Sequence, residues 1–256
     1  MPRTVTGMQP YLFPYLGYFQ LIANSDVFAI GDDMQFVRGA WINRNRVLAH
    51  GEPKLFSVPL KKGSLGDSVR DRRLGDDFER EAAALLKMIS RLYAKAPYRS
   101  QTLPLIEQIF ACPERNLALF AEHSLRLLCR HMGIDTPICR TSELTLDKTL
   151  DRQERVIEIT RQLGGDCYIN PIGGIDLYCP ARFREAGVKL RFLKMDEVEY
   201  QQLKHSFVPS LSIIDVLMFN APEALPDLLR AFTLVEGVEP NTTRDARASQ
   251  GSAQPA

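Results

Sequence analysis

The sequence carries almost no net charge, because 32 lysines and arginines stand against 31 aspartates and glutamates in 256 residues. Such a balance creates no long-range field that would hold the protein on nucleic acid or on an anionic membrane, so any phosphate binding must be local. Long apolar runs are also missing: none approaches the length of a membrane span, and the N-terminus lacks the apolar stretch of a secretory signal. We therefore expect a cytoplasmic protein that neither binds nucleic acid nor inserts into a membrane.

Cysteine and histidine patterns typical of metal sites are absent as well. The five cysteines are widely spaced, form no C-x-x-C pair and lie mostly among apolar residues, which predicts reduced thiols. His123 and His131 are eight residues apart, too far for a metal pair on adjacent helical turns. The nucleotide-binding patterns G-x-G-x-x-G and G-x-x-x-x-G-K-[ST] do not occur. No metal site is predicted, and the sequence leaves the identity of any cofactor open.

The sequence does contain a regular alternation of short apolar segments with helical patterns, in an ordinary globular composition. The apolar segments predict strands at residues 4–8, 26–30, 54–60, 137–139, 167–170 and 188–193, the last as a half-exposed edge strand. Helical spacing predicts helices at about residues 15–23, 77–93, 103–110, 116–132, 150–163, 180–185, 210–219 and 222–232. This order predicts an α/β fold with a mainly parallel open sheet flanked by helices, Rossmann-like, with a helical insertion in the middle third.

The same patterns predict the domain organisation. We expect a single α/β domain over residues 1–235, in which about 77–132 form the helical segment. Residues 61–77 are rich in Gly, Asp and Arg and predict a mobile loop that could fold over a ligand. Residues 236–256 have no apolar face, and we expect them to form a disordered tail.

Polar side chains gather after two of the predicted strands, at the sheet edge where open α/β sheets bind ligands. Amides, carboxylates and a guanidinium of this kind can hold a hydroxylated or phosphorylated ligand, and the aromatic rings of Phe36 and Trp41 lie among them. The predicted ligand-binding residues are Gln9, Tyr11, Gln35, Asn43 and Arg44, with Asp32 and Asp33 as candidates for proton transfer. The alternative is that the two aspartates only form a turn and that Arg44 only pairs with them.

Two later segments are further candidates for ligand binding. Asn170 ends a predicted strand, and Gly173 and Gly174 follow it; the glycines allow close backbone approach to a ligand or an anion-binding nest, or else a plain turn. Ser212 and Asp215 stand at a predicted helix start, where they either face an anionic ligand or simply cap the helix.

Histidine is the side chain that titrates nearest to neutral pH. His205, just before the segment with Ser212, is therefore the best candidate for a general base among the four histidines. The alternative is an ordinary structural or surface histidine.

These segments resemble the WbqC-like family of bacterial proteins. The resemblance is carried by MQPY at residues 8–11, PYLGYF at 14–19, DVF at 26–28, DDMQF at 32–36 and WINRN at 41–45, then by YIN at 168–170, GG at 173–174, LY at 177–178 and LSIID at 211–215. It covers the chain up to about residue 232. The resemblance implies a role in the biosynthesis of O-antigen and other surface polysaccharides, and a cytosolic step on a nucleotide-activated sugar.

Three functions are compatible with this pattern. The leading hypothesis is a transferase that acylates or aminoacylates a nucleotide-linked amino sugar, in which Arg44 and the Gly173–Gly174 loop hold phosphate, Gln9 and Asn43 orient the sugar, and Asp32, Asp33 or His205 accepts the proton. The second is a non-catalytic sugar-nucleotide-binding or assembly protein. The third is a nucleotidyltransferase-like enzyme, although residues 15–18 lack the histidines of the H-x-G-H motif that such enzymes use.

Overall fold

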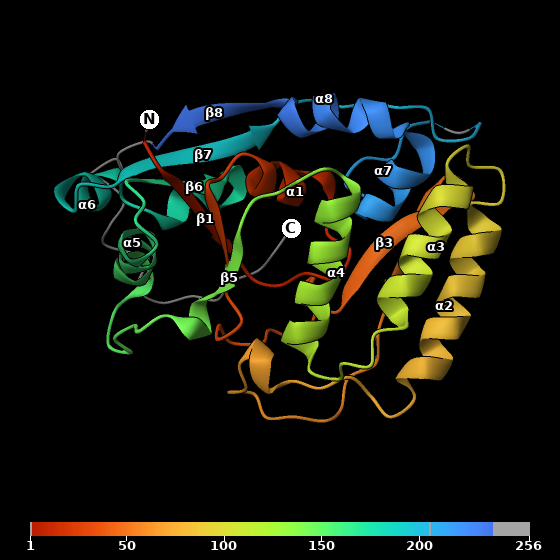
Figure 1. Cartoon of the computed structure of the whole chain (residues 1–256), viewed down its shortest axis with the longest axis horizontal. Helices are drawn as coiled ribbons and strands as arrows, with labels where there is room; N and C mark the ends of the chain where they lie inside the picture. The colour runs from red at the N-terminus through yellow and green to blue at the C-terminus, as the bar shows by residue number, and fades with distance from the viewer. Residues whose placement is uncertain (1, 205, 238–256) are drawn as a thin grey trace.

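A six-stranded mixed sheet, mostly parallel and flanked by helices, forms the framework of the protein (Figure 1). The computed structural model describes residues 2–204 and 206–237. The strand order is β5-β2-β1-β6-β7-β8, and only β8 runs antiparallel to its neighbour. The sheet strands are β1 Thr4–Met8, β2 Val27–Ile30, β5 Ile138–Arg140, β6 Cys167–Pro171, β7 Lys189–Met195 and β8 Phe232–Glu236. The predicted α/β class with a mainly parallel sheet is confirmed.

The last strand corrects the prediction at one edge of the sheet. Residues 188–193 were expected to form an edge strand, but β7 is paired on both sides, with β6 and with β8. Residue 232 was expected to end a helix, yet Phe232 begins the true edge strand. The prediction failed because alternating apolar and charged residues report the burial of the two faces of a strand, not the pairing of its backbone edges.

The two faces of the sheet are covered by different helices, as the two-residue period of the strands requires. Tyr168, Leu190 and Phe192 point to the side of α5 and α6 and form one small core. The intervening Cys167 and Ile169 point to the other side, against α1. The helices and 3₁₀ turns are α1 Leu16–Ala23, η1 Val69–Asp71, α2 Phe78–Leu92, α3 Arg99–Phe110, α4 Leu117–His131, η2 Thr141–Glu143, α5 Arg152–Gln162, η3 Ile172–Leu177, α6 Pro180–Glu185, α7 Ile213–Phe219, η4 Pro222–Ala224 and α8 Leu225–Arg230.

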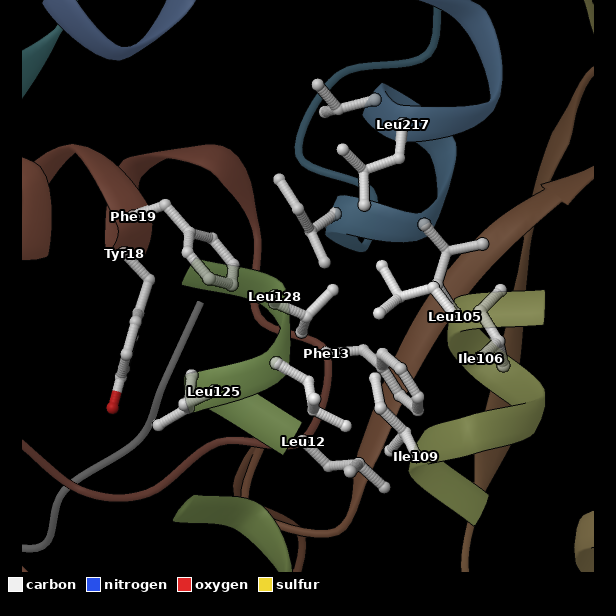
Figure 2. Packing of buried hydrophobic residues seen from close by; sticks show 14 of the residues in the cluster. Leu12, Phe13, Tyr18, Phe19, Leu105, Ile106, Ile109, Leu125, Leu128 and Leu217 are labelled. Carbon is white, nitrogen blue, oxygen red and sulfur yellow. The ribbon is translucent and has the colours of Figure 1, made fainter. Parts of the chain in front are cut away.

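The largest core lies between the sheet and the helices α2, α3, α4 and α7. Figure 2 shows Leu12 and Phe13, from the turn after β1, inserted between α3 and α4 with Leu105, Ile109 and Leu128 around them. The segment after β1, which carries much of the opening sequence pattern, therefore joins the sheet to the helical part of the chain. Burial of this segment in the core explains why its residues are apolar, so a ligand is not needed to explain them.

A two-stranded hairpin, β3 Arg44–Ala49 with β4 Glu52–Ser57, stands apart from the main sheet. Only its second strand was predicted. The turn consists of His50 and Gly51, both with positive φ, 54° and 84°. Two such residues form the type of tight turn that joins antiparallel strands, and the His-Gly pair was the sequence signal for it.

The segment predicted to be a mobile loop is fastened at several points. Isolated bridges pair Ser68 with Gln35 and Leu74 with Leu60. Arg72 is 9 % exposed, stacks on Phe36 and donates to Asp67 at 3.0 Å. The contacts of Ser68 and Arg72 hold this segment against the loop that follows β2. Of the predicted disordered tail, residues 238–256 lie outside the described residues.

Candidate functional site

A cavity of about 230 Å³ opens at the carboxyl edge of the parallel strands. Its walls come from the ends of β1 and β2, from β6, and from α5, which stands beside β1 and β6 (Figure 1). The lining residues are Gly7, Met8, Ala29, Gly31, Met34, Thr141, Arg152, Arg155, Val156, Ile159, Tyr168, Leu177 and Tyr178. Because parallel strands leave a crevice for ligands at this edge, the cavity is the candidate functional site.

Small residues at the strand ends create the space. A Cβ atom added at Gly7 would lie 3.6 Å from the carbonyl oxygen of Ala29 and 3.8 Å from the hydroxyl of Tyr168. Both neighbours line the cavity, so a larger side chain at position 7 would extend into it. The glycine is thus a determinant of the cavity volume.

One polar wall is built on Asp33, which holds two lining residues in place. Nη2 of Arg155 lies 2.7 Å from each carboxylate oxygen of Asp33, and Oγ1 of Thr141 donates to the same carboxylate at 2.5 Å. The side chains of Arg155 and Asp33 are 26 % and 20 % exposed, so the ion pair is partly shielded from water. Arg152, on the same helix, also lines the cavity and has no ion-pair partner in the described part of the chain.

Asp32 does not pair with Arg155 as Asp33 does, and it bonds mainly to Ser142 instead. Its carboxylate is buried and accepts hydrogen bonds from the backbone N–H and the hydroxyl of Ser142, at 3.0 and 2.6 Å. These bonds fasten η2 to the end of β2, and η2 begins with Thr141. Asp32 is therefore a positioning residue for the polar wall.

Two tyrosines form a further part of the lining. The Tyr168 ring is fully enclosed and packs 6.1 Å from the Tyr178 ring, centroid to centroid. Burial raises the pKa of Tyr168 well above its ordinary value, and burial also raises the pKa of Tyr178. Both phenols therefore stay protonated at neutral pH and can donate or accept hydrogen bonds but do not act as bases.

Gln9 and Gln35 connect the strand ends to the segment at 61–77. Nε2 of Gln9 donates to the backbone oxygen of Gln35 at 3.2 Å, and Nε2 of Gln35 donates to the backbone oxygen of Leu65 at 2.8 Å. Tyr11 packs against Tyr18 with centroids 5.6 Å apart. None of these three lines the cavity, although Gln9 directly follows the lining residue Met8.

The predicted pair Asn43 and Arg44 belongs to the hairpin rather than to the cavity. Asn43 donates to the backbone oxygen of Val58 at 2.9 Å, and Arg44 packs over Trp41. The structure therefore divides the first predicted group: Asp32 and Asp33 support the cavity, while Asn43 and Arg44 lie elsewhere.

Asn170 and the double glycine lie beside the cavity without lining it. The amide of Asn170 occupies the space where a Cβ of Gly174 would stand, so this glycine makes room for a side chain of the protein itself. Gly173 is exposed and has no atom within 4 Å of an added Cβ. Asn170 also accepts from the hydroxyl of Tyr168 at 3.3 Å, which links it to the cavity wall.

Ser212 and Asp215 are part of the core. Ser212 caps α7 and donates to the backbone oxygen of Phe13 at 2.8 Å. Asp215 is fully buried and accepts from Tyr93, Tyr200 and Gln202 at 2.8, 2.8 and 2.6 Å. Both residues thus make structural contacts here. His205 lies outside the described residues.

Arg152, Arg155 and Thr141 were not among the predicted site residues. Arg152 and Arg155 lie in the first turn and a half of α5, where a cation opposes the helix dipole; Asp151 and Glu154 cap that end. Basic residues at a helix N-terminus, where they are electrostatically unfavourable, were a sequence signal that could have identified these two arginines as site residues. Thr141 could be found only from the pairing of β5 with β2, which joins residues about 110 positions apart.

Neither a metal cluster nor a membrane helix is found in the described residues. Over 2–204 and 206–237, no three His, Cys, Asp or Glu side chains are grouped to hold a metal ion. No helix in these ranges has both the length and the apolar character to cross a bilayer.

Fold and cavity together define an α/β protein with a cavity at the carboxyl edge of a mainly parallel sheet. The chain belongs to the WbqC-like protein family, whose model matches residues 9–226. It is similar to a Mycobacterium tuberculosis protein named "Uncharacterized protein Rv1507c", with 28 % identity over 232 residues that cover 89 % of this chain and 98 % of the relative. No solved structure matches the chain.

Proposed function

We propose that the protein is a cytoplasmic transferase of surface-polysaccharide biosynthesis that acylates or aminoacylates the amino group of a nucleotide-activated sugar. The observation that carries this proposal is the cavity, which combines apolar walls with two arginines. Val156, Ile159 and Met34 offer surface for a deoxysugar methyl group or an acyl chain, while Arg152 and Arg155 offer guanidinium groups for a phosphate. The WbqC-like family, whose name is linked to O-antigen genes, supports the pathway.

The cavity volume bears on which part of the substrate enters. At about 230 Å³ it is smaller than the range of about 300–1,000 Å³ that is usual for drug-sized ligands. It suits one sugar ring or one acyl group, not a whole nucleotide. In this proposal the sugar lies inside the cavity and its diphosphate reaches Arg152 at the rim. The ligand then binds at the carboxyl ends of the parallel strands, as ligands do in Rossmann-like proteins.

The transfer step requires a proton acceptor for the amine. The sugar nitrogen attacks the acyl carbonyl, the donor's leaving group departs with the bonding electrons, and the nitrogen loses a proton. We propose that Thr141 accepts this proton as it passes its own to Asp33, 2.5 Å away. Positioning of the two substrates supplies the rest of the rate.

A specific observation supports a second candidate, a non-catalytic sugar-nucleotide-binding protein. Among the described residues, the cavity lining contains no His, Asp or Glu. Asp32 and Asp33 both have donors within the protein. A site that binds a ligand without transforming it needs no proton acceptor, so this lining is sufficient for binding.

The two candidates can be separated with the purified full-length chain. We would measure its thermal midpoint against UDP-, dTDP- and GDP-linked amino sugars, free nucleotides, acyl-CoA and aminoacyl donors, because a ligand that binds only the native state raises the midpoint. Stabilisation by a sugar nucleotide with product formed from a donor supports the transferase. Stabilisation without product from any donor supports the binding protein, and no stabilisation by a sugar nucleotide contradicts both.

The Gly7→Val variant tests whether the cavity is the site. Valine suits a strand, and its methyl groups would fill the space between Ala29 and Tyr168. We expect the sugar-nucleotide stabilisation to disappear while the unliganded midpoint changes little. Gly173→Ala is the matched control, since its added methyl group meets no atom within 4 Å and lies outside the lining. Equal ligand response in both variants would refute the site.

The Thr141→Val variant tests the proton path in an active preparation. Valine keeps the shape but removes the hydroxyl between the cavity and Asp33. We expect kcat to fall about 100-fold with little change in KM, the size usual for loss of a proton-transfer group. Thr149→Val is the matched control, because it is the same substitution at an exposed threonine whose hydroxyl contacts Asp147, outside the cavity lining. Unchanged kcat in Thr141→Val contradicts the path.

A further inference from the structure

One face of the β3–β4 hairpin carries two cations that have no counterion in the described part of the chain. Along β3 the side chains alternate: Asn45 and Val47 are buried, whereas Arg44 and Arg46 are half-buried and stand opposite the exposed Ser57 and Leu55 of β4. The two arginines therefore share one face of the hairpin, opposite to the face of Asn45 and Val47.

Both guanidinium groups pack on the same indole ring. The Cζ atoms of Arg44 and Arg46 lie 5.4 and 5.0 Å from the centroid of Trp41. Such contacts stabilise each cation through the ring quadrupole and fix the plane of the guanidinium group. They also bring two positive charges close to one ring.

The hydrogen-bonding groups of these arginines are incompletely used. The Nε atoms of both are buried and have no acceptor. No carboxylate within residues 2–204 and 206–237 pairs with either guanidinium group, whereas Arg155 is paired with Asp33 and Arg72 with Asp67. The protein thus places two half-buried cations against one indole ring, and no carboxylate of the described residues compensates their charge.

An anion is the group that this arrangement lacks. Two neighbouring like charges repel each other, and the repulsion is stronger where burial reduces screening by water. A dianion between them removes the repulsion and supplies acceptors, and two planar guanidinium forks match the oxygens of phosphate groups. Phosphate, and diphosphate in particular, has the charge and the number of oxygens to engage both.

We propose that Trp41, Arg44 and Arg46 form a second anion site, which binds a phosphate or diphosphate group either free or as part of a nucleotide. The site is distinct from the cavity at the sheet edge, because none of the three residues lines that cavity. It does not depend on the transferase activity, so either proposal can fail without the other.

Trp41 gives a direct measurement of this site, since it is the only tryptophan in the sequence. We would titrate the full-length protein with inorganic phosphate, pyrophosphate and UDP, and follow tryptophan fluorescence. We expect a saturable change, at lower concentration for pyrophosphate than for phosphate. Half-saturation at lower concentration for UDP than for pyrophosphate would identify a nucleotide as the ligand, and similar values would identify the diphosphate group itself.

Charge-removal variants connect the signal to the two arginines. Loss of one charge-assisted contact typically weakens binding about tenfold or more, so Arg44→Gln and Arg46→Gln should each raise the half-saturating concentration of pyrophosphate by about that factor. Arg44→Lys, which keeps the charge but not the fork, should lie between wild type and Arg44→Gln. Arg230→Gln is the matched control: its side chain is 73 % exposed and pairs with Asp227, so its titration should equal that of wild type.

Three results would overturn the proposal. The first is the absence of a saturable fluorescence change with any of the three anions at several millimolar. The second is an equal change with sodium chloride of the same ionic strength, which would indicate screening alone. The third is an unaltered pyrophosphate titration in Arg44→Gln and Arg46→Gln. The wild-type titration decides the question even if a variant fails to fold.

Discussion

Asp215 and Asp33 each accept three hydrogen bonds, but their donors and surroundings differ. The donors to Asp215 are two phenols and an amide, all neutral, and the carboxylate is fully buried. Asp33 receives a guanidinium group as well as a hydroxyl, and it remains 20 % exposed beside the cavity. Carboxylates with the same number of hydrogen bonds can therefore have different structural roles: Asp215 joins chain segments in the core, whereas Asp33 holds Arg155 and Thr141 at the cavity wall.

The Asp215→Ala variant should have the largest effect. It leaves Tyr93, Tyr200 and Gln202 without their buried acceptor. The bonds that join α7 to the end of α2 and to the segment before α7 are then lost. Since each unsatisfied buried group costs about 1–3 kcal/mol, we expect the free energy of unfolding to fall by about 3 kcal/mol or more. Urea denaturation followed by circular dichroism measures it. A loss below about 1 kcal/mol would show that the network is not a structural tie.

The Asp33→Ala variant should destabilise the fold less. It removes a partly exposed ion pair, so we expect a decrease of about 1–2 kcal/mol in the free energy of unfolding. Freed from Asp33, Arg155 should also lose its fixed position, which would weaken ligand binding in the cavity. Asp33→Asn serves as the companion variant, because its amide oxygen can still accept from Thr141. If Asp33→Ala is as destabilising as Asp215→Ala, the two carboxylates do not differ as proposed.

The pH dependence of stability provides a third test of the comparison. Burial raises the pKa of Asp215, although its hydrogen bonds act in the opposite direction. The folded protein therefore holds a proton on Asp215 at pH values where the unfolded chain, with an ordinary pKa of about 3.9, has lost it. The stabilisation from this proton is fully present below the unfolded-state pKa of about 3.9. It is lost as pH rises through the pKa of Asp215 in the folded protein.

Asp215→Asn isolates this contribution, because its amide stays neutral at every pH. We expect the stability of wild type relative to Asp215→Asn to decrease as pH is raised from about 4, as measured by urea denaturation at each pH. Each unit of pKa difference between the folded and unfolded states corresponds to about 1.4 kcal/mol. A constant difference between the two proteins across this range would mean that the pKa of Asp215 is the same in both states.

The two aspartates also show how far the sequence could lead. The apolar strand before Gly31 placed Asp32 and Asp33 correctly at the carboxyl edge, since strand ends follow from local pattern. Their partners could not be predicted locally: Thr141 and Arg155 are 108 and 122 positions away from Asp33. Asp215 stood at a helix start in the sequence, which favours a cap or an anion site. Its burial depends on Tyr93, 122 positions away, and no helical pattern reports that contact.

The Asp76→Ala variant completes the series with an exposed carboxylate and should have the smallest effect. Asp76 pairs with Lys61 at 2.5 Å, but the two side chains are 88 % and 50 % exposed. Water and salt screen such a pair, and ordering the two side chains costs entropy, so exposed ion pairs contribute little. We expect the free energy of unfolding to match that of wild type within error in the same urea measurement. A loss comparable to that of Asp33→Ala would show that residues 61–77 depend on this pair, and that exposure alone does not rank the three carboxylates.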